Sequence, residues 1–450
     1  MKRFLAALLA LMLASPAWAG WTNVFSSGPS SPNFFSWTTD GTKIYIVDGN
    51  SSPRMWSIST SAWARLSDPS IFSGNLLGLA YDSASGKIIG VGSGGSYADA
   101  GYSIYTIATP AWAQDTTTTG LGRIRGATPH VYGSSNFVFT SVVDGTNPAS
   151  ARLLGLTSFG NSLTSLDTAA STSNAYISSG STLCRNSSTS LTAFWLRNDS
   201  KIDYKGYGAG SALYSAVTGT SIATSANIIS QAICWPTQNL ALVVPAYTAG
   251  NSTALVVNSS GTAVINQSLT GLFRGGAVSP DDTALLIAKN DGTVYSSNGS
   301  ANFADTGIGT PSLSGATIYA LVTLSSHVYL LAGDGKAWKY TASPSTSFTA
   351  DKTTCSAPCS VSFTNATTTV AAPPVTSWSW TFGDSGTSSS QSPTHVYAAA
   401  GTYTVALSAT NADGSETQTR TNYITVSASS RQRKRGPFGT QPFGSIPFSP

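Results

Sequence analysis

The chain has 450 residues, of which 41% are hydrophobic and only 9% are charged. That hydrophobic content is too high for a disordered polymer, and the length exceeds that of one small domain, so we expect two or more domains. The net charge of +4 comes from the two ends of the chain, while acids and bases nearly balance between them. A body without excess positive charge argues against nucleic acid as the partner.

Residues 1–19 have the pattern of a signal peptide. Two basic residues precede an apolar run over residues 4–13, which is too short to cross a bilayer as a helix. Ala17-Trp18-Ala19 then gives the small-x-small motif that precedes a cleavage site; an ordinary buried helix is the alternative. No later segment has the roughly 20 apolar residues of a transmembrane helix. We expect an exported bacterial protein that is extracellular, surface-bound or periplasmic, and not an integral membrane protein.

One apolar strand recurs seven times, usually after a short polar turn, and its copies begin 44, 50, 54, 49, 44 and 44 residues apart. Another apolar strand precedes the copies, across turns of hairpin composition, and a third and often a fourth strand follow. This pattern predicts an all-β chain with a seven-bladed β-propeller over residues 20–345; an array of β-sandwiches or a β-helix is the alternative. The copies are Lys43–Asp48, Lys87–Gly92, Phe137–Val142, Leu191–Leu196, Leu240–Pro245, Ala284–Lys289 and Val328–Gly333.

A ring of sheets also needs a strand that joins its two ends. Trp21–Phe25 is similar to Trp63–Leu66, a predicted fourth strand, so we expect the N-terminus to supply the outer strand of the last sheet. The segment Ser347-Phe348-Thr349 is the competing candidate.

Two segments add a resemblance to known propellers. Val278–Ser296 resembles the blades of WD-like and bacterial surface-layer (YVTN-like) propellers. Val294–Gly307 is similar to an Asp-box blade of the sialidase type, although Asn298 stands where that family has aspartate. The resemblance implies the fold and carries little information about activity.

Four cysteines in an exported chain predict two disulfides. Cys355 and Cys359 form the local pair. Cys184 and Cys234 each end an apolar strand just before the turn to the recurring strand, so they occupy matching places in adjacent repeats and a bond between them is expected. Two buried free thiols are the alternative for this second pair.

A different pattern occupies residues 346–428. Trp380-Thr-Phe-Gly-Asp384 is followed by Ser-Pro-Thr-His395-Val-Tyr and by alternating apolar residues up to Leu407. This closely resembles a PKD (polycystic kidney disease) domain, an immunoglobulin-like β-sandwich, with Ser385 before Gly386 as a departure. PKD domains are non-catalytic modules of extracellular proteins, so the resemblance implies a spacer or an interaction module.

The residues of this second domain also have a physical interpretation. Trp380 and Phe382 share one face and are expected in the core, and Tyr403, Val405 and Leu407 alternate inward. His395 is predicted to be structural, and Asp384 to accept backbone amides in its turn. The spacing of Cys355 and Cys359 lacks the two further ligands of a zinc site.

Residues 429–450 predict a disordered tail. Its basic cluster would suit anionic lipid or polysaccharide, and its phenylalanines, each after a proline and five residues apart, would suit the apolar pockets of a docking partner; a tail of no fixed role is the alternative. These residues are Arg431, Arg433, Lys434, Arg435, Phe438, Phe443 and Phe448.

The chain is poor in catalytic residues. Glu416 is its only glutamate, whereas the usual glycosidase needs two carboxylates. His130 and His327 are the only histidines before the second domain, both predicted in loops, and a G-x-S-x-G nucleophile elbow is missing. We therefore expect no catalytic residues, no metal and no cofactor.

A binding or adhesion protein is the function that these observations favour. The propeller would recognise an extracellular glycan or protein, with Trp235 and Tyr247 as candidates for sugar stacking, although a place in the core is the commoner fate of such aromatics. The alternatives are a polysaccharide-active hydrolase or lyase that relies on aspartates, and a structural component of a surface or viral assembly.

Overall fold

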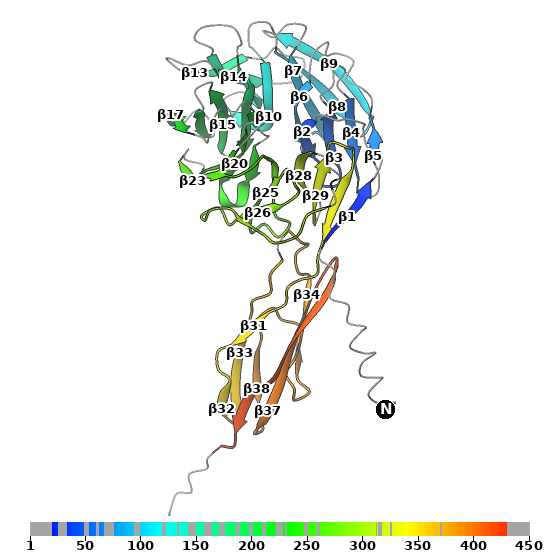
Figure 1. The fold of residues 1–450 in the computed structure, drawn as a ribbon, viewed down its shortest axis with the longest axis vertical. Helices are drawn as coiled ribbons and strands as arrows, with labels where there is room; N and C mark the ends of the chain where they lie inside the picture. The colour runs from blue at the N-terminus through cyan, green and yellow to red at the C-terminus, as the bar shows by residue number, and fades with distance from the viewer. Residues whose placement is uncertain are drawn as a thin grey trace, which may run out of the picture. The chain divides into compact units, whose positions relative to one another are not determined.

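The computed structural model divides the chain into two compact units (Figure 1). The first comprises Met1–Ser343 with Thr369–Pro374 and Asn411–Gly414, and the second comprises Pro344–Thr368, Val375–Thr410 and Ser415–Pro450. The signal-peptide range and most of the predicted tail lie outside the described residues. The structure describes residues 20–25, 34–48, 54–59, 63–66, 76–93, 100–118, 123–132, 135–142, 150–156, 164–170, 176–185, 190–197, 201–208, 213–221, 228–229, 232–246, 251–258, 262–311, 313, 317–324, 326–369 and 371–429.

The described part of the first unit consists of seven small antiparallel sheets, here numbered first to seventh along the chain. Within the described ranges, no helix is long and apolar enough to cross a membrane. The sheets are: first, β2 (Phe34–Thr39), β3 (Ile44–Asp48), β4 (Arg54–Ile58), β5 (Trp63–Arg65); second, β6 (Leu76–Asp82), β7 (Lys87–Ser93), β8 (Ala100–Thr106), β9 (Ala111–Thr118); third, β10 (Arg123–Tyr132), β11 (Ser135–Val142), β12 (Ser150–Leu156), β13 (Thr164–Ala170); fourth, β14 (Tyr176–Arg185), β15 (Ser190–Arg197), β16 (Lys201–Gly208), β17 (Leu213–Ser221); fifth, β18 (Ile228–Ile229), β19 (Ile233–Trp235), β20 (Leu240–Val243), β21 (Pro245–Ala246), β22 (Ser252–Asn258), β23 (Ala263–Leu269); sixth, β24 (Phe273–Val278), β25 (Leu285–Lys289), β26 (Val294–Ser297), β27 (Ala304–Asp305); seventh, β28 (Ile318–Leu324), β29 (His327–Ala332), β30 (Ala337–Thr341) and β1 (Gly20–Phe25).

The recurring apolar strand forms the second strand of each sheet, as β3, β7, β11, β15, β20 with β21, β25 and β29. Each copy pairs with a strand on both sides, and both faces of the copies β3, β15, β25 and β29 are buried. This position explains the continuous apolar runs, because a strand buried on both faces has no polar side to alternate. In β25, for example, Leu285, Leu286, Ile287 and Ala288 are all fully buried.

The N-terminal strand β1 completes the seventh sheet, as predicted. It pairs antiparallel with β30, with Trp21 opposite Tyr340. The indole Nε1–H of Trp21 donates to the carbonyl oxygen of Gly309 at 3.1 Å, and its ring lies 5.3 Å from that of Tyr340. Phe348, in the competing segment, belongs instead to β31 in the second unit.

Neighbouring sheets of the first unit pack through their first strands and share apolar cores. β6 contacts β2 and β10, β24 contacts β19 and β28, and β28 also contacts β2. One core cluster contains Ile46 of the first sheet together with Val322 and Leu331 of the seventh. The first and last sheets in the sequence are thus packing partners.

The first strand is irregular at the same place in every one of the seven sheets. In the first sheet, Phe34 lies opposite Asp48 and Ser36 opposite Val47, so one extra residue stands in the first strand. One extra residue also stands in the first strand of the second, third, sixth and seventh sheets, and in the fourth sheet three extra residues stand between Tyr176 and Ser181. In the fifth, the first strand is divided into β18 and β19 at this point. Such bulges increase the local twist and change the direction of side chains.

The second unit is a sandwich of two sheets with one core, which contains Trp380 and Phe382 as predicted. The rings of these two residues are stacked with centroids 6.3 Å apart. Val405 and Leu407 are buried, and Tyr403 is half-buried. One sheet has β31 (Phe348–Ala350), β33 (Cys359–Asn365) and β36 (Thr394–Tyr397); the other has β32 (Thr354–Ser356), β38 (Gly414–Ser427), β37 (Gly401–Asn411), β34 (Ser377–Thr381) and β35 (Thr387–Ser388).

Candidate functional site

Trp235, a candidate for sugar stacking, lies in the core of the first unit. It ends β19, is 1% exposed, and packs in a cluster with Leu240 and Phe303. Its indole Nε1–H donates to Asp282 Oδ1 at 2.7 Å. Its ring is therefore covered by protein rather than open to a ligand. Tyr247 lies outside the described residues, as does the basic and phenylalanine-containing part of the tail.

Both predicted disulfides are present. Cys184 in β14 is bonded to Cys234 in β19, with the Cα atoms 5.4 Å apart, so the bond joins the first strands of the fourth and fifth sheets. Cys355 and Cys359, with Cα atoms 6.0 Å apart, join β32 to the start of β33 in the second unit. Disulfides of this kind are typical of proteins outside the cytoplasm.

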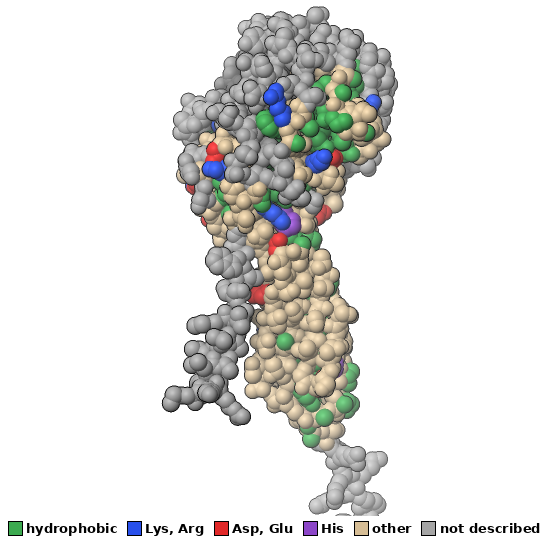
Figure 2. All heavy atoms as spheres, turned by 90° about the vertical axis from the view of Figure 1, so that its right-hand side faces the viewer, with side chains coloured by type: hydrophobic (Ala, Val, Ile, Leu, Met, Phe, Trp, Pro, Cys, Tyr) green, Lys and Arg blue, Asp and Glu red, His purple; other side chains and the backbone are tan. Residues whose placement is uncertain are grey.

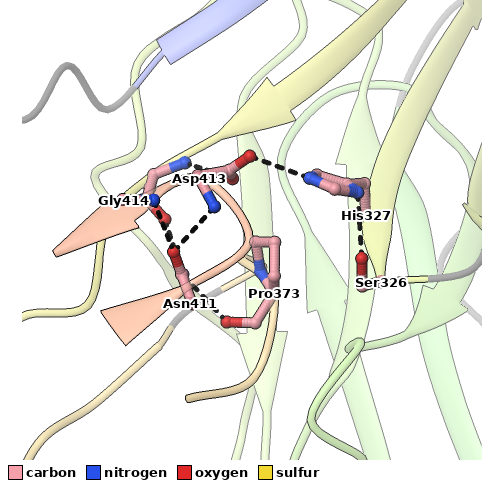
Figure 3. Close-up of polar contacts among 7 residues, drawn as sticks. Ser326, His327, Pro373, Asn411, Asp413 and Gly414 are labelled. Carbon is pink, nitrogen blue, oxygen red and sulfur yellow. Dashed lines mark hydrogen bonds and ion pairs between the residues drawn. The ribbon is translucent and has the colours of Figure 1, made fainter. Parts of the chain in front are cut away.

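A buried polar cluster in the first unit brings together a serine, a histidine and an aspartate (Figure 3). Ser326 Oγ lies 3.1 Å from His327 Nδ1, and His327 Nε2 lies 2.9 Å from Asp413 Oδ1. The second oxygen of Asp413 accepts the backbone N–H of Ala342 at 2.9 Å. Burial raises the pKa of Tyr329 and of Tyr340, and the negative charge of Asp413 adds to both shifts.

Asn411 also belongs to this cluster, and both polar atoms of its side-chain amide form hydrogen bonds. Its Nδ2 donates to the carbonyl oxygens of Ala342 and Pro373 at 2.9 and 3.0 Å. Its Oδ1 accepts the backbone N–H groups of Asp413 and Gly414 at 2.9 and 3.1 Å. Asn411 is 4% exposed, so these bonds satisfy groups that water cannot reach.

The cluster has the residue types of a hydrolase triad, but its hydrogen bonds are those of a structural network. A triad needs a serine, an imidazole and an orienting carboxylate in line, and the Ser326, His327 and Asp413 distances fit that chain of contacts. However, the second carboxylate oxygen of Asp413 and both polar atoms of the Asn411 side-chain amide are hydrogen-bonded to backbone atoms. Fully satisfied buried networks of this kind make a local structure rigid.

Sequence reasoning missed this cluster and misplaced its histidine. His327 begins β29 and His130 lies within β10, so the expectation that both lie in loops was wrong. His327 itself pairs with Leu324 of β28, and Pro129, next to His130, pairs with Phe137 of β11. The Asn411-Ala-Asp413-Gly414 turn, whose side chains bond their own backbone, was the available signal.

Aspartates in the turns of the first unit are also engaged with their own backbone. Asp40 Oδ1 accepts the N–H groups of Thr42 and Lys43 at 2.8 and 2.7 Å, and Oδ2 accepts the hydroxyl of Tyr45 at 2.9 Å. Burial alone would raise the pKa of Asp40, but these hydrogen bonds lower it below its usual value. Asp82, Asp281, Asp291 and Asp334 accept the amide two residues on in the same way.

Asn298 accepts the amides of its own turn in the same way as these aspartates. Its Oδ1 accepts the backbone N–H groups of Ser300 and Ala301 at 3.1 and 3.0 Å. Among the residues that the structure describes, no group of three or more His, Cys, Asp or Glu side chains could hold a metal ion.

In the second unit, another histidine lies beside a carboxylate. His395 Nε2 lies 2.8 Å from Asp384 Oδ2, and Asp384 Oδ1 accepts the N–H of Gly386 at 2.9 Å. The imidazole is stacked on Phe382 with centroids 4.1 Å apart. Asp384 thus bonds a turn amide, as predicted, and His395 is part of the local packing.

The surface of the second unit is mainly uncharged on the face drawn in Figure 2. In β33, exposed Ser360, Ser362 and Thr364 alternate with buried Val361 and Phe363. Small hydroxyl side chains of this kind keep a sheet face soluble without charge.

Comparison with known proteins identifies one part of the chain. Residues 341–426 match the family model of the PKD domain. The whole chain matches no curated protein. The sandwich, its Trp380 and Phe382 core and its turn at Asp384 agree with that match. A PKD domain and disulfides together suggest an extracellular protein, and residues 341–426 of this one belong to the PKD domain family.

Proposed function

We propose that the first unit is a seven-bladed β-propeller and that the protein is a secreted or cell-surface binding protein. The propeller recognises an extracellular glycan or protein, and the PKD domain is its spacer or a second interaction module. The sheets support this fold by their number, by their shared strand order and by the completion of the seventh sheet through β1.

The packing of the first sheet against the seventh is the observation that carries the proposal. Ile46 and Val322 come from these two sheets, share one core and are fully buried. In an open row of sheets, the outer faces of the first and the last would meet water and expose their apolar residues. A ring buries both, and it gathers loops from all sheets at its two ends, where a ligand can be held.

The carboxylates of this chain fit a binding protein better than an enzyme. The turn aspartates bond their own backbone, as Asp40 and Asp281 do. Glu416 Oε2 accepts the backbone N–H of Thr346 at 2.8 Å within the second unit. Carboxylates held in this way serve the fold, whereas glycoside hydrolysis needs two that face one substrate.

A glycan array combined with a turnover assay tests this function. The secreted protein is applied with and without residues 429–450, and each hit is incubated with the protein and assayed for new reducing ends. We expect a hit that survives removal of the tail and releases no reducing ends. Release of reducing ends would establish the enzyme alternative instead. Binding that disappears with the tail, or the lack of any glycan or secreted-protein ligand, would contradict recognition by the propeller.

A further inference from the structure

We propose that Asn298 is a site of spontaneous modification. When the turn that contains it opens, the backbone nitrogen of Gly299 displaces the side-chain amide of Asn298, and water converts the product to aspartate or isoaspartate. The closed turn suppresses this reaction and accepts only the aspartate product. The inference concerns the turn between β26 and β27 and does not depend on the proposed ring.

The sequence places a glycine directly after this asparagine. Asn298 is exposed to solvent, and its Asn-Gly pair is the only one in the sequence. A residue without a Cβ atom is conformationally free, so its backbone nitrogen can come close to the preceding side chain, as an intramolecular attack requires. Asn302 is exposed in the same loop but precedes Phe303, whose side chain hinders that approach.

The reaction balances with water as its co-reactant. The Gly299 nitrogen loses its proton to solvent and bonds to Cγ of Asn298, while the bond from Cγ to Nδ2 breaks and Nδ2 takes up a proton to leave as ammonia. The product is a succinimide ring. Water opens the ring by cleaving the bond of the Gly299 nitrogen to Cγ, which gives aspartate. Cleavage of its bond to the main-chain carbonyl carbon instead gives isoaspartate, whose backbone is one methylene longer.

Hydrogen bonds in the closed turn hold both reacting groups. The N–H of Gly299 donates to Ser297 Oγ at 3.1 Å, and that hydroxyl donates to the carbonyl oxygen of Ala301. Asn298 Oδ1 accepts the N–H groups of Ser300 and Ala301 at 3.1 and 3.0 Å and the hydroxyl of Ser300 at 3.0 Å. Movement of Cγ onto the Gly299 nitrogen breaks these bonds, so the reaction requires local opening.

Apolar contacts also fix the turn and decide which product it accepts. Gly299 has φ +84°, and a Cβ atom there would lie 2.5 Å from Leu240 Cδ1 and 3.2 Å from Trp235 Cζ3. Phe303 is 4% exposed and packs in the same cluster as these two residues. Isoaspartate at position 298 would lengthen the backbone beside this contact, where close packing leaves no space for an added methylene.

Aspartate at position 298, by contrast, fits the turn. Asp40 and Asp291 each accept the N–H of the residue two positions on through Oδ1, as Asn298 does. The aspartate product keeps the oxygen on which the turn's hydrogen bonds depend. Chains with aspartate should therefore refold, and chains with isoaspartate should not.

Peptide mass spectrometry of the full-length protein tests the inference. The protein is incubated at mildly alkaline pH in buffer and in urea, with water labelled with heavy oxygen, so that each converted residue carries the label. Asn302 is the internal control. The variants are Ser297→Ala, which removes the hydroxyl that holds Gly299, and Ser296→Ala, its control in β26. Gly299→Ala is measured only in urea, where folding does not matter, and circular dichroism confirms that the two serine variants are folded.

We expect Asn298 to react much faster than Asn302 in urea, and Gly299→Ala to remove that difference. In the folded protein the reaction at Asn298 should be at least about tenfold slower, because only the opened fraction of chains reacts. Ser297→Ala should raise the folded-state rate about fivefold, which corresponds to the loss of one hydrogen bond, whereas Ser296→Ala should match the wild type. After refolding, the folded fraction should contain aspartate and no isoaspartate.

Three results with the wild type would overturn the inference. Equal rates at Asn298 and Asn302 in urea would refute the site, and equal rates at Asn298 in buffer and in urea would refute its protection by the turn. Isoaspartate in the refolded fraction, in the same proportion as in urea, would refute the selection between products. These comparisons need no variant, so they decide the inference even where Ser297→Ala does not fold. A wild-type rate in folded Ser297→Ala would contradict the role of its hydroxyl.

Discussion

Gly275 and Gly307 have the same backbone conformation but different surroundings. Both have φ +68°, a region that costs a residue with a Cβ atom about 1–2 kcal/mol. Around Gly307, nothing lies within 4 Å of an added Cβ, whereas at Gly275 backbone atoms of β28 lie 2.7 and 2.8 Å away. A comparison of the two glycines therefore separates the free-energy cost of the backbone conformation from the cost of close packing.

Substitution of each glycine by alanine should show this difference. Gly307→Ala should lower the free energy of unfolding by about 1 kcal/mol, from the backbone conformation alone. Gly275→Ala should lower it by about 2–4 kcal/mol, because the contact with β28 adds an overpacking penalty. Urea unfolding monitored by tryptophan fluorescence measures both, and equal losses would contradict the tight contact between β24 and β28.

Asp384 makes the stability of the PKD domain depend on pH. Burial alone would raise its pKa, but the hydrogen bonds from His395 and from the N–H of Gly386 lower the pKa below its ordinary value of 3.8. A carboxyl group with a lowered pKa in the folded state stabilises the fold above its unfolded-state pKa. That contribution is lost as the pH falls through the folded-state pKa.

Asp384→Asn should reduce the acid sensitivity of the protein. Between about pH 6 and about pH 3, the wild type should lose more stability than the variant, because only the wild type must protonate Asp384. Urea unfolding curves of both proteins at the two pH values give this difference. Parallel losses in the two proteins would show that the pairing with His395 contributes nothing to stability.

Several single residues could be predicted from the sequence and others could not. The core positions of Trp380 and Phe382 follow from their spacing within a recognisable motif. Trp235 resembles a loop aromatic because its strand has only three residues and a Pro236 turn follows. Its burial depends on Asp282 and Phe303, which are far along the chain, so no local pattern could reveal it.

At the scale of elements, the two disulfides constrain very different lengths of chain. Cys184 and Cys234 are 50 residues apart and connect two sheets, whereas Cys355 and Cys359 are 4 residues apart. A crosslink stabilises the native state by restricting the unfolded chain, and the effect grows with the size of the closed loop.

Replacing each pair by alanines should therefore have unequal effects. Loop-closure entropy gives a loss of about 4 kcal/mol for Cys184/Cys234 and about 2 kcal/mol for Cys355/Cys359. The measurement is urea unfolding of the two double variants against the wild type under oxidising conditions. A larger loss for the local pair would contradict the assignment of this stabilisation to the unfolded state.

The second strands could be predicted because their burial on both faces leaves continuous apolar runs. The bulges could not, since an extra residue such as Phe35 or Tyr319 looks like any strand residue until its partner strand is known. Gly275, beside Gly276, marks such a position by composition.

At the scale of the whole first unit, the shared core of the first and seventh sheets offers a test that distinguishes a ring from an open row. Ile46 lies at its centre with Val322 and Leu331, and all three are fully buried. In a ring, a cavity at this position weakens sheets from both ends of the sequence. In a row, it would weaken only the first sheet.

Ile46→Ala should thus destabilise the unit by about 2–5 kcal/mol and loosen both end sheets together. Hydrogen exchange measured by mass spectrometry should become faster in peptides from β28–β30 as well as in those from β2–β4. Val361→Ala, which alters the core of the PKD domain, is the control and should leave both sets of peptides unchanged. Faster exchange confined to β2–β4 would refute the closed ring.

The pairing of β1 with β30 makes the order of export matter. A chain that leaves the cell N-terminus first presents β1 long before its partner appears, because the two strands lie at opposite ends of the unit's sequence. Until then β1 is an unpaired strand, open to pairing with another chain, and the seventh sheet cannot be completed. If the chain is secreted, its folding should therefore depend on factors outside the cytoplasm that shield the early strand while the rest of the unit emerges.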